Sequence, residues 1–182
     1  MRIESQIEIT PTSAVLNGQT IKVENTGEKM LVELYRRFVG DYPKFFKMDT
    51  LSRLGFIAAE LILREYRVQN TEYRPDAIIL ANRSASIKND RDYLDTISEG
   101  KYYPSPALFV YTLPNIVTGE IAIRHHIQGE TSFYILDKPE QLEPIIQSTI
   151  TNHQSPIAIL AGWCECSGQN EFYAKLQIIW NN

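Results

Sequence analysis

Two short runs of apolar residues constrain the fold of this chain more than any other feature. They are AIILA at Ala77–Ala81 and PIAILAG at Pro156–Gly162, and both are too short for an ordinary helix. An unbroken apolar run of this length is typical of a strand that is buried on both faces, as in a parallel sheet covered by helices. We therefore expect an α/β fold in which helices cover both faces of a mostly parallel sheet.

The residues between these runs show the spacing of amphipathic helices. A first helix is expected over Glu28–Val39, and a longer one follows Asp49 or Thr50, either of which can cap it. The apolar face of the longer helix consists of Leu51, Leu54, Ile57, Ala58, Leu61 and Ile62. Strands and helices in alternation form βαβ units with right-handed crossovers, which supports the expectation of a parallel sheet.

Both ends of the chain carry the alternating pattern of half-exposed strands. Ile3–Ile9 alternates apolar and polar residues, and the run after it predicts a small hairpin around Asn17–Gly18. Phe172–Trp180 is expected to be a last strand at the edge of the sheet, with alternate apolar residues on one face. The chain has no internal repeat, so residues 1–182 are expected to form a single domain.

The stretch between Tyr103 and Asp137 combines proline breaks, a helix and a strand. Asn115 is expected to cap the helix IVTGEIAIRHHI, and Gly129 is expected to end it. The run SFYIL that follows is short and rich in aromatic and branched residues, so it predicts a buried strand. Beyond this strand, Asp137 is expected to cap a further helix, with Glu140 completing a capping box.

The pattern P-S-P…L-P-N…G-E-I-A-I…G in this stretch resembles the thiolase-fold β-ketoacyl synthases, the condensing enzymes of fatty-acid and polyketide synthesis. The run IAILAGWCE is also similar to the family's strand that ends in A-G-G-x-E, with Trp163 in place of the second glycine. Because the condensing enzymes are considerably longer than this chain, the resemblance implies their N-terminal half, a thiolase-like half domain.

In that family, the strand of this region leads into a sharp turn that carries the nucleophilic cysteine. Counted from Gly129, the cysteine would fall at or beside Lys138, where this chain reads Leu136, Asp137, Lys138, Pro139. The other catalytic residues of the family come from the C-terminal half. The resemblance therefore implies a chain without catalytic residues, and we expect no bound cofactor and no metal.

Composition and charge limit the classes of binding partner and the cellular compartment that are expected for this chain. Acidic residues outnumber basic ones by 22 to 18, so no broad positive face for nucleic acid is expected. No run approaches the roughly 20 apolar residues of a membrane span, and residues 1–20 lack the apolar core of a signal peptide. Cys164 and Cys166 are expected to point to opposite faces of a strand and not to pair. These features predict a cytoplasmic protein.

The histidines and cysteines could carry chemistry, but structural roles explain them better. The same holds for the glycine inside the helix. His125 and His126 are adjacent on the predicted helix, about 100° apart, which does not suit one metal ion; a solvated or interface pair is expected. Cys164 and Cys166 lack a second ligand pair, so buried thiols are expected there. Gly119 inside the helix costs about 1 kcal/mol relative to alanine, which predicts a close helix contact at this position.

The resemblance implies a non-catalytic, ketosynthase-like subunit of fatty-acid or polyketide-type chain assembly, with a role like that of chain length factors. Two alternatives stay open. The chain could instead be a divergent acyltransferase of the 3-oxoacyl-acyl-carrier-protein synthase type, active in its own right. It could also be a free-standing module that binds acyl chains or a carrier protein. The missing nucleophile weighs against the enzyme.

The strand before Lys138 is the predicted interface. In the resembled family, the corresponding strand lies at the sheet edge and pairs with its twin across a dimer axis. Here it comprises Thr131, Ser132, Phe133, Tyr134, Ile135 and Leu136, with no proline or lysine to protect its edge. We expect a homodimer or a heterodimer with an active ketosynthase, and an acyl carrier protein as a further partner.

Overall fold

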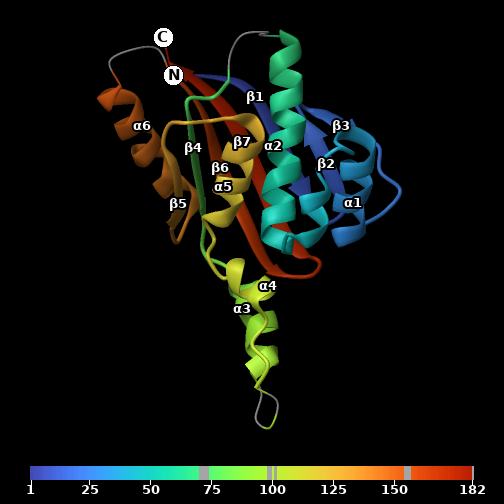
Figure 1. The fold of residues 1–182 in the computed structure, drawn as a ribbon. Helices are drawn as coiled ribbons and strands as arrows, with labels where there is room; N and C mark the ends of the chain where they lie inside the picture. The colour runs from blue at the N-terminus through green and yellow to red at the C-terminus, as the bar shows by residue number, and fades with distance from the viewer. Residues whose placement is uncertain (70–73, 98–99, 101, 154–156, 182) are drawn as a thin grey trace.

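A mixed sheet of seven strands organises the described part of the chain (Figure 1). The computed structural model describes residues 1–69, 74–97, 100, 102–153 and 157–181. The strands lie side by side in the order β3-β2-β1-β7-β6-β4-β5. Their bounds are β1 (Arg2–Thr10), β2 (Ser13–Leu16), β3 (Gln19–Ile21), β4 (Ala77–Asn82), β5 (Thr131–Ile135), β6 (Ile157–Gly168) and β7 (Glu171–Asn181).

The prediction of a mostly parallel sheet was wrong. Only β4 has parallel neighbours, β5 and β6, and the other paired strands are antiparallel. β6 turns within residues 169–170 into β7, and such a tight hairpin enforces antiparallel pairing. β7 therefore lies between β6 and β1 in the middle of the sheet, not at its edge as expected. The alternation of apolar and polar residues in β7 is the same for a strand at the edge of a sheet and for one in its middle, so it could not decide between them.

The hairpin and the buried strands agree with the sequence-based predictions. β2 and β3 pair antiparallel around Asn17–Gly18, with Asn17 and Gly18 in the left-handed conformation that this turn requires. All residues of β4 are buried. β6 extends well beyond the predicted run to Gly168, and Pro156 lies outside the described residues.

Helices cover the two faces of the sheet unequally. α2 (Thr50–Gln69) and α5 (Ile116–His125) pack on one face, and α1 (Gly27–Phe38) packs against α2. α6 (Leu142–Asn152) packs on the other face, against β6. The shorter helical segments are η1 (Pro43–Lys47), α3 (Ile87–Leu94), η2 (Asp95–Ile97), α4 (Pro106–Val110) and η3 (Pro139–Gln141). None of the described helices is long and apolar enough to cross a membrane.

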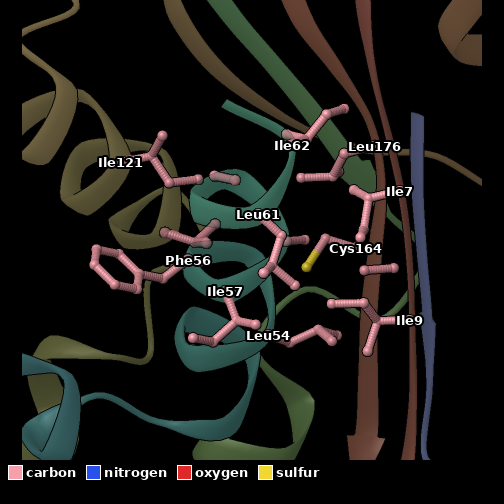
Figure 2. Packing of buried hydrophobic residues seen from close by; sticks show 14 of the residues in the cluster. Ile7, Ile9, Leu54, Phe56, Ile57, Leu61, Ile62, Ile121, Cys164 and Leu176 are labelled. Carbon is pink, nitrogen blue, oxygen red and sulfur yellow. The ribbon is translucent and has the colours of Figure 1, made fainter. Parts of the chain in front are cut away.

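The larger apolar cluster lies between α2, α5 and the sheet (Figure 2). The predicted apolar face of α2 is buried in it, and Asp49 caps the helix by accepting a hydrogen bond from the Ser52 N–H at 3.0 Å. Cys164 and Cys166 both belong to this cluster. The expectation that they point to opposite faces was wrong, because residues two apart on a strand share a face.

The ends of α5 differ from the prediction. Asn115 precedes the helix but its side chain makes no capping hydrogen bond. The helix ends at His125, and the next residue, His126, adopts a left-handed conformation. Gly129 serves a different purpose: a Cβ there would lie 1.9 Å from the carbonyl oxygen of Asp76. The glycine thus allows the chain to pass close to the start of β4.

The close helix contact that was predicted at Gly119 occurs at Gly55 instead. A Cβ on Gly55, in α2, would lie 2.3 Å from Cγ2 of Val117 in α5, whereas a Cβ on Gly119 would meet nothing within 4 Å. α2 and α5 therefore approach each other through the α2 glycine.

Alanine substitution of the two glycines is expected to have opposite effects. Gly119→Ala should stabilise the fold by about 0.5–1 kcal/mol, because alanine is the better helix former and has open space there. Gly55→Ala should destabilise it by about 1–3 kcal/mol, because the two helices must move apart. Urea denaturation of both variants measures this, and a stabilising effect of both would contradict the contact between α2 and α5.

Residues 86–97, 100 and 102–113 form an arm that projects beyond the carboxyl ends of β4 and β5 (Figure 1). It comprises α3, η2 and α4, whose chains fold back on each other. Ser86 is the residue before α3, which begins at Ile87. α5 follows the arm in the sequence and packs beside β5.

Candidate functional site

The turn between β5 and α6 is the first candidate site, because the resemblance places the family's nucleophile there. β5 ends beside β4, and the Leu136 N–H donates to the carbonyl oxygen of Asn82 at 2.8 Å. The turn then continues into η3, where the backbone N–H of Lys138 donates to Oε1 of Gln141 at 3.0 Å. The correspondence of Lys138 to the family's cysteine stays a prediction.

Asp137 does not cap this helix as predicted. The residue before η3 is Lys138, and the reciprocal contact from within the helix comes from Gln141, not Glu140. The side chains of Asp137 and Lys138 are exposed. An exposed carboxylate and an exposed ammonium group do not form the thioester that an acyl-transfer step through cysteine requires.

The two cysteines of the chain lie on the opposite face of the sheet from α6. Cys164 and Cys166 are 0% and 1% exposed, and both belong to the larger apolar cluster, whereas α6 packs in the smaller one. Burial raises the pKa of the Cys166 thiol to about 12, and burial likewise raises the pKa of the Cys164 thiol well above its ordinary value. Both thiols therefore stay protonated at neutral pH and are poor nucleophiles. The expectation of buried thiols is confirmed.

His125 is not the solvated or interface residue that was expected. It is buried in α5, and its Nε2 lies 3.0 Å from Oε1 of Glu60 in α2. Nε of Arg124 donates to the same oxygen at 3.0 Å, and the Arg124 guanidinium also pairs with Asp41. Burial raises the pKa of Glu60, but the hydrogen bonds and charges of His125 and Arg124 outweigh it, so the pKa is lowered. His126, by contrast, is exposed.

A second buried carboxylate lies in α5, within the G-E-I-A-I motif. Glu120 is 5% exposed, pairs with Nζ of Lys44 at 2.5 Å and accepts a hydrogen bond from the Tyr42 hydroxyl at 3.1 Å. The hydrogen bond with Glu120 raises the pKa of Lys44. Glu60 joins α2 to α5, and Glu120 joins α5 to Tyr42 and to Lys44 in η1, so these charges hold the helices together.

Sequence reasoning missed Glu60 and Glu120. Each is an acid inside an apolar helical run, AAELIL and GEIAI respectively, and this is the only signal that the sequence carries. Their partners Lys44 and Arg124 lie far along the chain, so the pairs become visible only in the folded protein.

β5 forms one edge of the sheet, and its outer side pairs with no described strand. The predicted buried strand is therefore half-buried at best, and Ile135 is exposed. Phe133 packs on the larger apolar cluster, whereas Tyr134 and Leu136 pack on the smaller one. The edge is thus apolar on both faces, and its backbone N–H and C=O groups on the outer side are available to another strand.

A groove of about 690 Å³ runs between α6 and the outer face of β6 and β7. Leu142, Ile146 and Trp163 supply apolar lining, and Glu140, Glu143 and Lys175 line it with charges. Pro139, next to Lys138, is also part of the lining. The volume is in the range of small-ligand pockets. No group of three or more metal-ligating side chains occurs among the described residues.

The structure is thus an α/β domain with a mixed sheet, whose edge strand β5 is followed by the turn into α6. No family model matches the sequence, and no curated protein matches it either. The fold does match solved structures. One is a ketosynthase, ApeO, in complex with its chain length factor, ApeC, from Xenorhabdus doucetiae, with a TM-score of 0.66 and 14% identity over 100% of this chain and 79% of that one.

A second similar structure is the ishigamide ketosynthase/chain length factor, with a TM-score of 0.66 and 14% identity. This match covers 97% of the present chain and 60% of the other, so the chain spans less than two thirds of that protein. The thiolase-like fold implied by the sequence resemblance is therefore confirmed. The assignment to an N-terminal half stays a prediction.

Proposed function

We propose that this chain is a non-catalytic, ketosynthase-like subunit that pairs with an active ketosynthase in fatty-acid or polyketide-type chain assembly, in the manner of a chain length factor. The observation that carries the proposal is the turn after β5. The sequence resemblance implies the family's cysteine at or beside Lys138, and the exposed residues of this turn, Asp137 and Lys138, are not acyl acceptors of that kind. The buried thiols of Cys164 and Cys166 do not substitute for it, because they are inaccessible and protonated.

The partner follows from β5. An apolar edge strand favours pairing with another strand, and the two similar solved structures described above contain a ketosynthase together with a chain length factor. We infer that the β5 edge pairs with the corresponding edge of an active ketosynthase. We also infer that an acyl carrier protein delivers the growing acyl chain to that catalytic partner.

Incubation of the purified chain with acyl-CoA or acyl-carrier protein is expected to give no acyl adduct in intact-mass spectrometry and no condensation product with malonyl-carrier protein. An active ketosynthase under the same conditions is the positive control. Adduct formation that Cys164→Ser, Cys166→Ser or Lys138→Arg abolishes would establish a nucleophile in this chain. That result would overturn the proposal of a non-catalytic subunit and favour a divergent acyltransferase.

The groove beside α6 favours a second candidate, a module that binds acyl chains without a partner. Its apolar lining suits an alkyl chain, and Lys175 lies at its wall for an anionic head group. Micromolar binding of a long-chain acyl-CoA to the isolated chain, weakened by Ile146→Asp and unchanged by Ile3→Ser, would favour the module. Absence of such binding is expected if the chain acts through a ketosynthase.

A further inference from the structure

A second groove, of about 630 Å³, lies along α1. Two further segments contribute to its lining, with Arg53 from α2 and Gln169 from the turn between β6 and β7. This turn lies close against the start of α1, because Gly27 has a φ of 61° and a Cβ on it would overlap Oδ1 of Asn170. The α1 groove is therefore built from three segments that only the fold brings together, and its volume is in the range of small-ligand sites.

The two acidic residues of the α1 groove already have partners within the fold. Glu33 accepts a hydrogen bond from the side-chain amide of Asn25 at 2.9 Å and pairs with Arg37 at 3.3 Å. The hydrogen bond from Asn25 holds the pKa of Glu33 below its ordinary value, so this carboxylate stays charged at neutral pH. Glu28 pairs with Arg53 at 3.8 Å. Each acid thus offsets one arginine of the lining.

Two cations of the lining are not offset in this way. Lys29 and Arg36 form no ion pair within the part of the chain that the structure describes. Both are exposed, and because they are seven positions apart they lie on one face of α1, about 10.5 Å from each other along its axis. Val32, which also lines the groove, lies between them in the helix. The α1 groove therefore has two surplus positive charges in a chain whose net charge is −4.

This arrangement suits a ligand with two negative charges on one compact group. A phosphate monoester carries about −1.5 to −2 charges at neutral pH and matches the surplus, whereas a single carboxylate does not. The planar guanidinium of Arg36 can bind two phosphate oxygens at once, and the flexible ammonium group of Lys29 can approach the same phosphate from the other end of the groove. Two surplus cations beside two acids are too few to hold a nucleic acid, whose affinity depends on many phosphate contacts.

We propose that the α1 groove binds the phosphate group of a small organic phosphate through Lys29 and Arg36. The volume of the groove leaves room for the organic part of such a ligand beside Val32. The site involves neither the β5 edge nor the groove beside α6, so it does not depend on the proposed function. Because the three segments that line the groove come together only in the folded chain, a bound ligand should also raise the melting temperature.

Glycerol 3-phosphate, glycerate and glycerol form a matched set of probes, since they present the same three-carbon body with a phosphate, a carboxylate or no charge. Binding to the full chain is measured by two-dimensional NMR of the backbone amides at low ionic strength, where screening is weak. Lys29→Ala and Arg36→Ala each remove an exposed cation of the α1 groove. Lys175→Ala is the charge-matched control, because it removes an exposed cation from the groove beside α6. Thermal unfolding establishes that each variant is folded.

Glycerol 3-phosphate is expected to shift the amides of α1 and of residues 169–170 saturably, with a Kd of about 1 mM or lower. Lys29→Ala and Arg36→Ala should each weaken this binding at least about fivefold, and Lys175→Ala should leave it within about twofold. Absence of saturable shifts, or equal weakening by all three variants, would overturn the proposal. Glycerate that binds as tightly as glycerol 3-phosphate would assign the α1 groove to carboxylates and overturn the phosphate ligand. None of these outcomes bears on the pairing with a ketosynthase.

Discussion

Gly162→Ala is expected to destabilise the protein by roughly 3 kcal/mol or more, the upper end of the range for overpacked core positions. Gly162 lies in β6 opposite Leu176, and a Cβ there would lie 2.1 Å from the carbonyl oxygen of Lys175 and 2.8 Å from Cα of Leu176. Both contacts are with backbone in the central β6–β7 pair, so neither can yield to a rotamer change.

Gly168→Ala in the same strand is the matched control. A Cβ on Gly168 would meet only the flexible side chain of Glu171, at 3.2 Å, and its cost is expected within about 0.5 kcal/mol. For a chain of this size, the difference corresponds to a melting temperature that is lower by about 6–12 °C for Gly162→Ala, measured by circular dichroism. Equal melting temperatures for the two variants would contradict the close approach of β6 and β7.

Glu60→Ala is expected to cost about 3 kcal/mol, because it removes the carboxylate that buried His125 and partly buried Arg124 share. Asp92→Ala is the control, since it breaks a more exposed ion pair with Lys88 on a helix surface and should cost about 0.5 kcal/mol. Urea denaturation at neutral pH compares the two variants. Similar small losses for both would show that the Glu60 pair contributes no more than a surface pair.

The same carboxylate predicts a pH dependence. The folded-state pKa of Glu60 is below its ordinary value of 4.5, so its contribution is fully present above about pH 4.5 and is lost as the pH falls through the lowered pKa. Glu60→Gln removes this titration and keeps the volume of the side chain. The unchanged protein should therefore lose stability more steeply below pH 4.5 than Glu60→Gln, and parallel acid profiles would exclude the linkage.

The local elements of this fold could be predicted from the sequence. The Asn17–Gly18 turn, the apolar face of α2 and its Asp49 cap depend on residues within a few positions of one another. The apolar run of β4 likewise marks a strand that is buried on both faces. Such signals depend only on residues that are close together in the chain. They therefore predict the local structure correctly regardless of how the rest of the chain is arranged.

The arrangement of the strands could not be predicted in the same way. β7 shows the same alternation whether it lies at an edge or between β1 and β6, and the choice depends on which distant strands pair with it. The predicted Asp137 cap failed for a related reason. The backbone hydrogen bond from Leu136 to Asn82 ties the chain to β4 before the turn begins, so tertiary contacts set where η3 starts.

The sequence alone determined that the turn after the edge strand lacks a cysteine, since Asp137, Lys138 and Pro139 are read directly from the chain. Only the tertiary structure decided that the two thiols lie on the same face of β6, that Glu60 meets His125, and that apolar residues of the arm are exposed. The physical reason is that residue identity and local spacing are properties of short segments. Burial, ion pairing and exposure are instead set by contacts between segments that are distant in the chain.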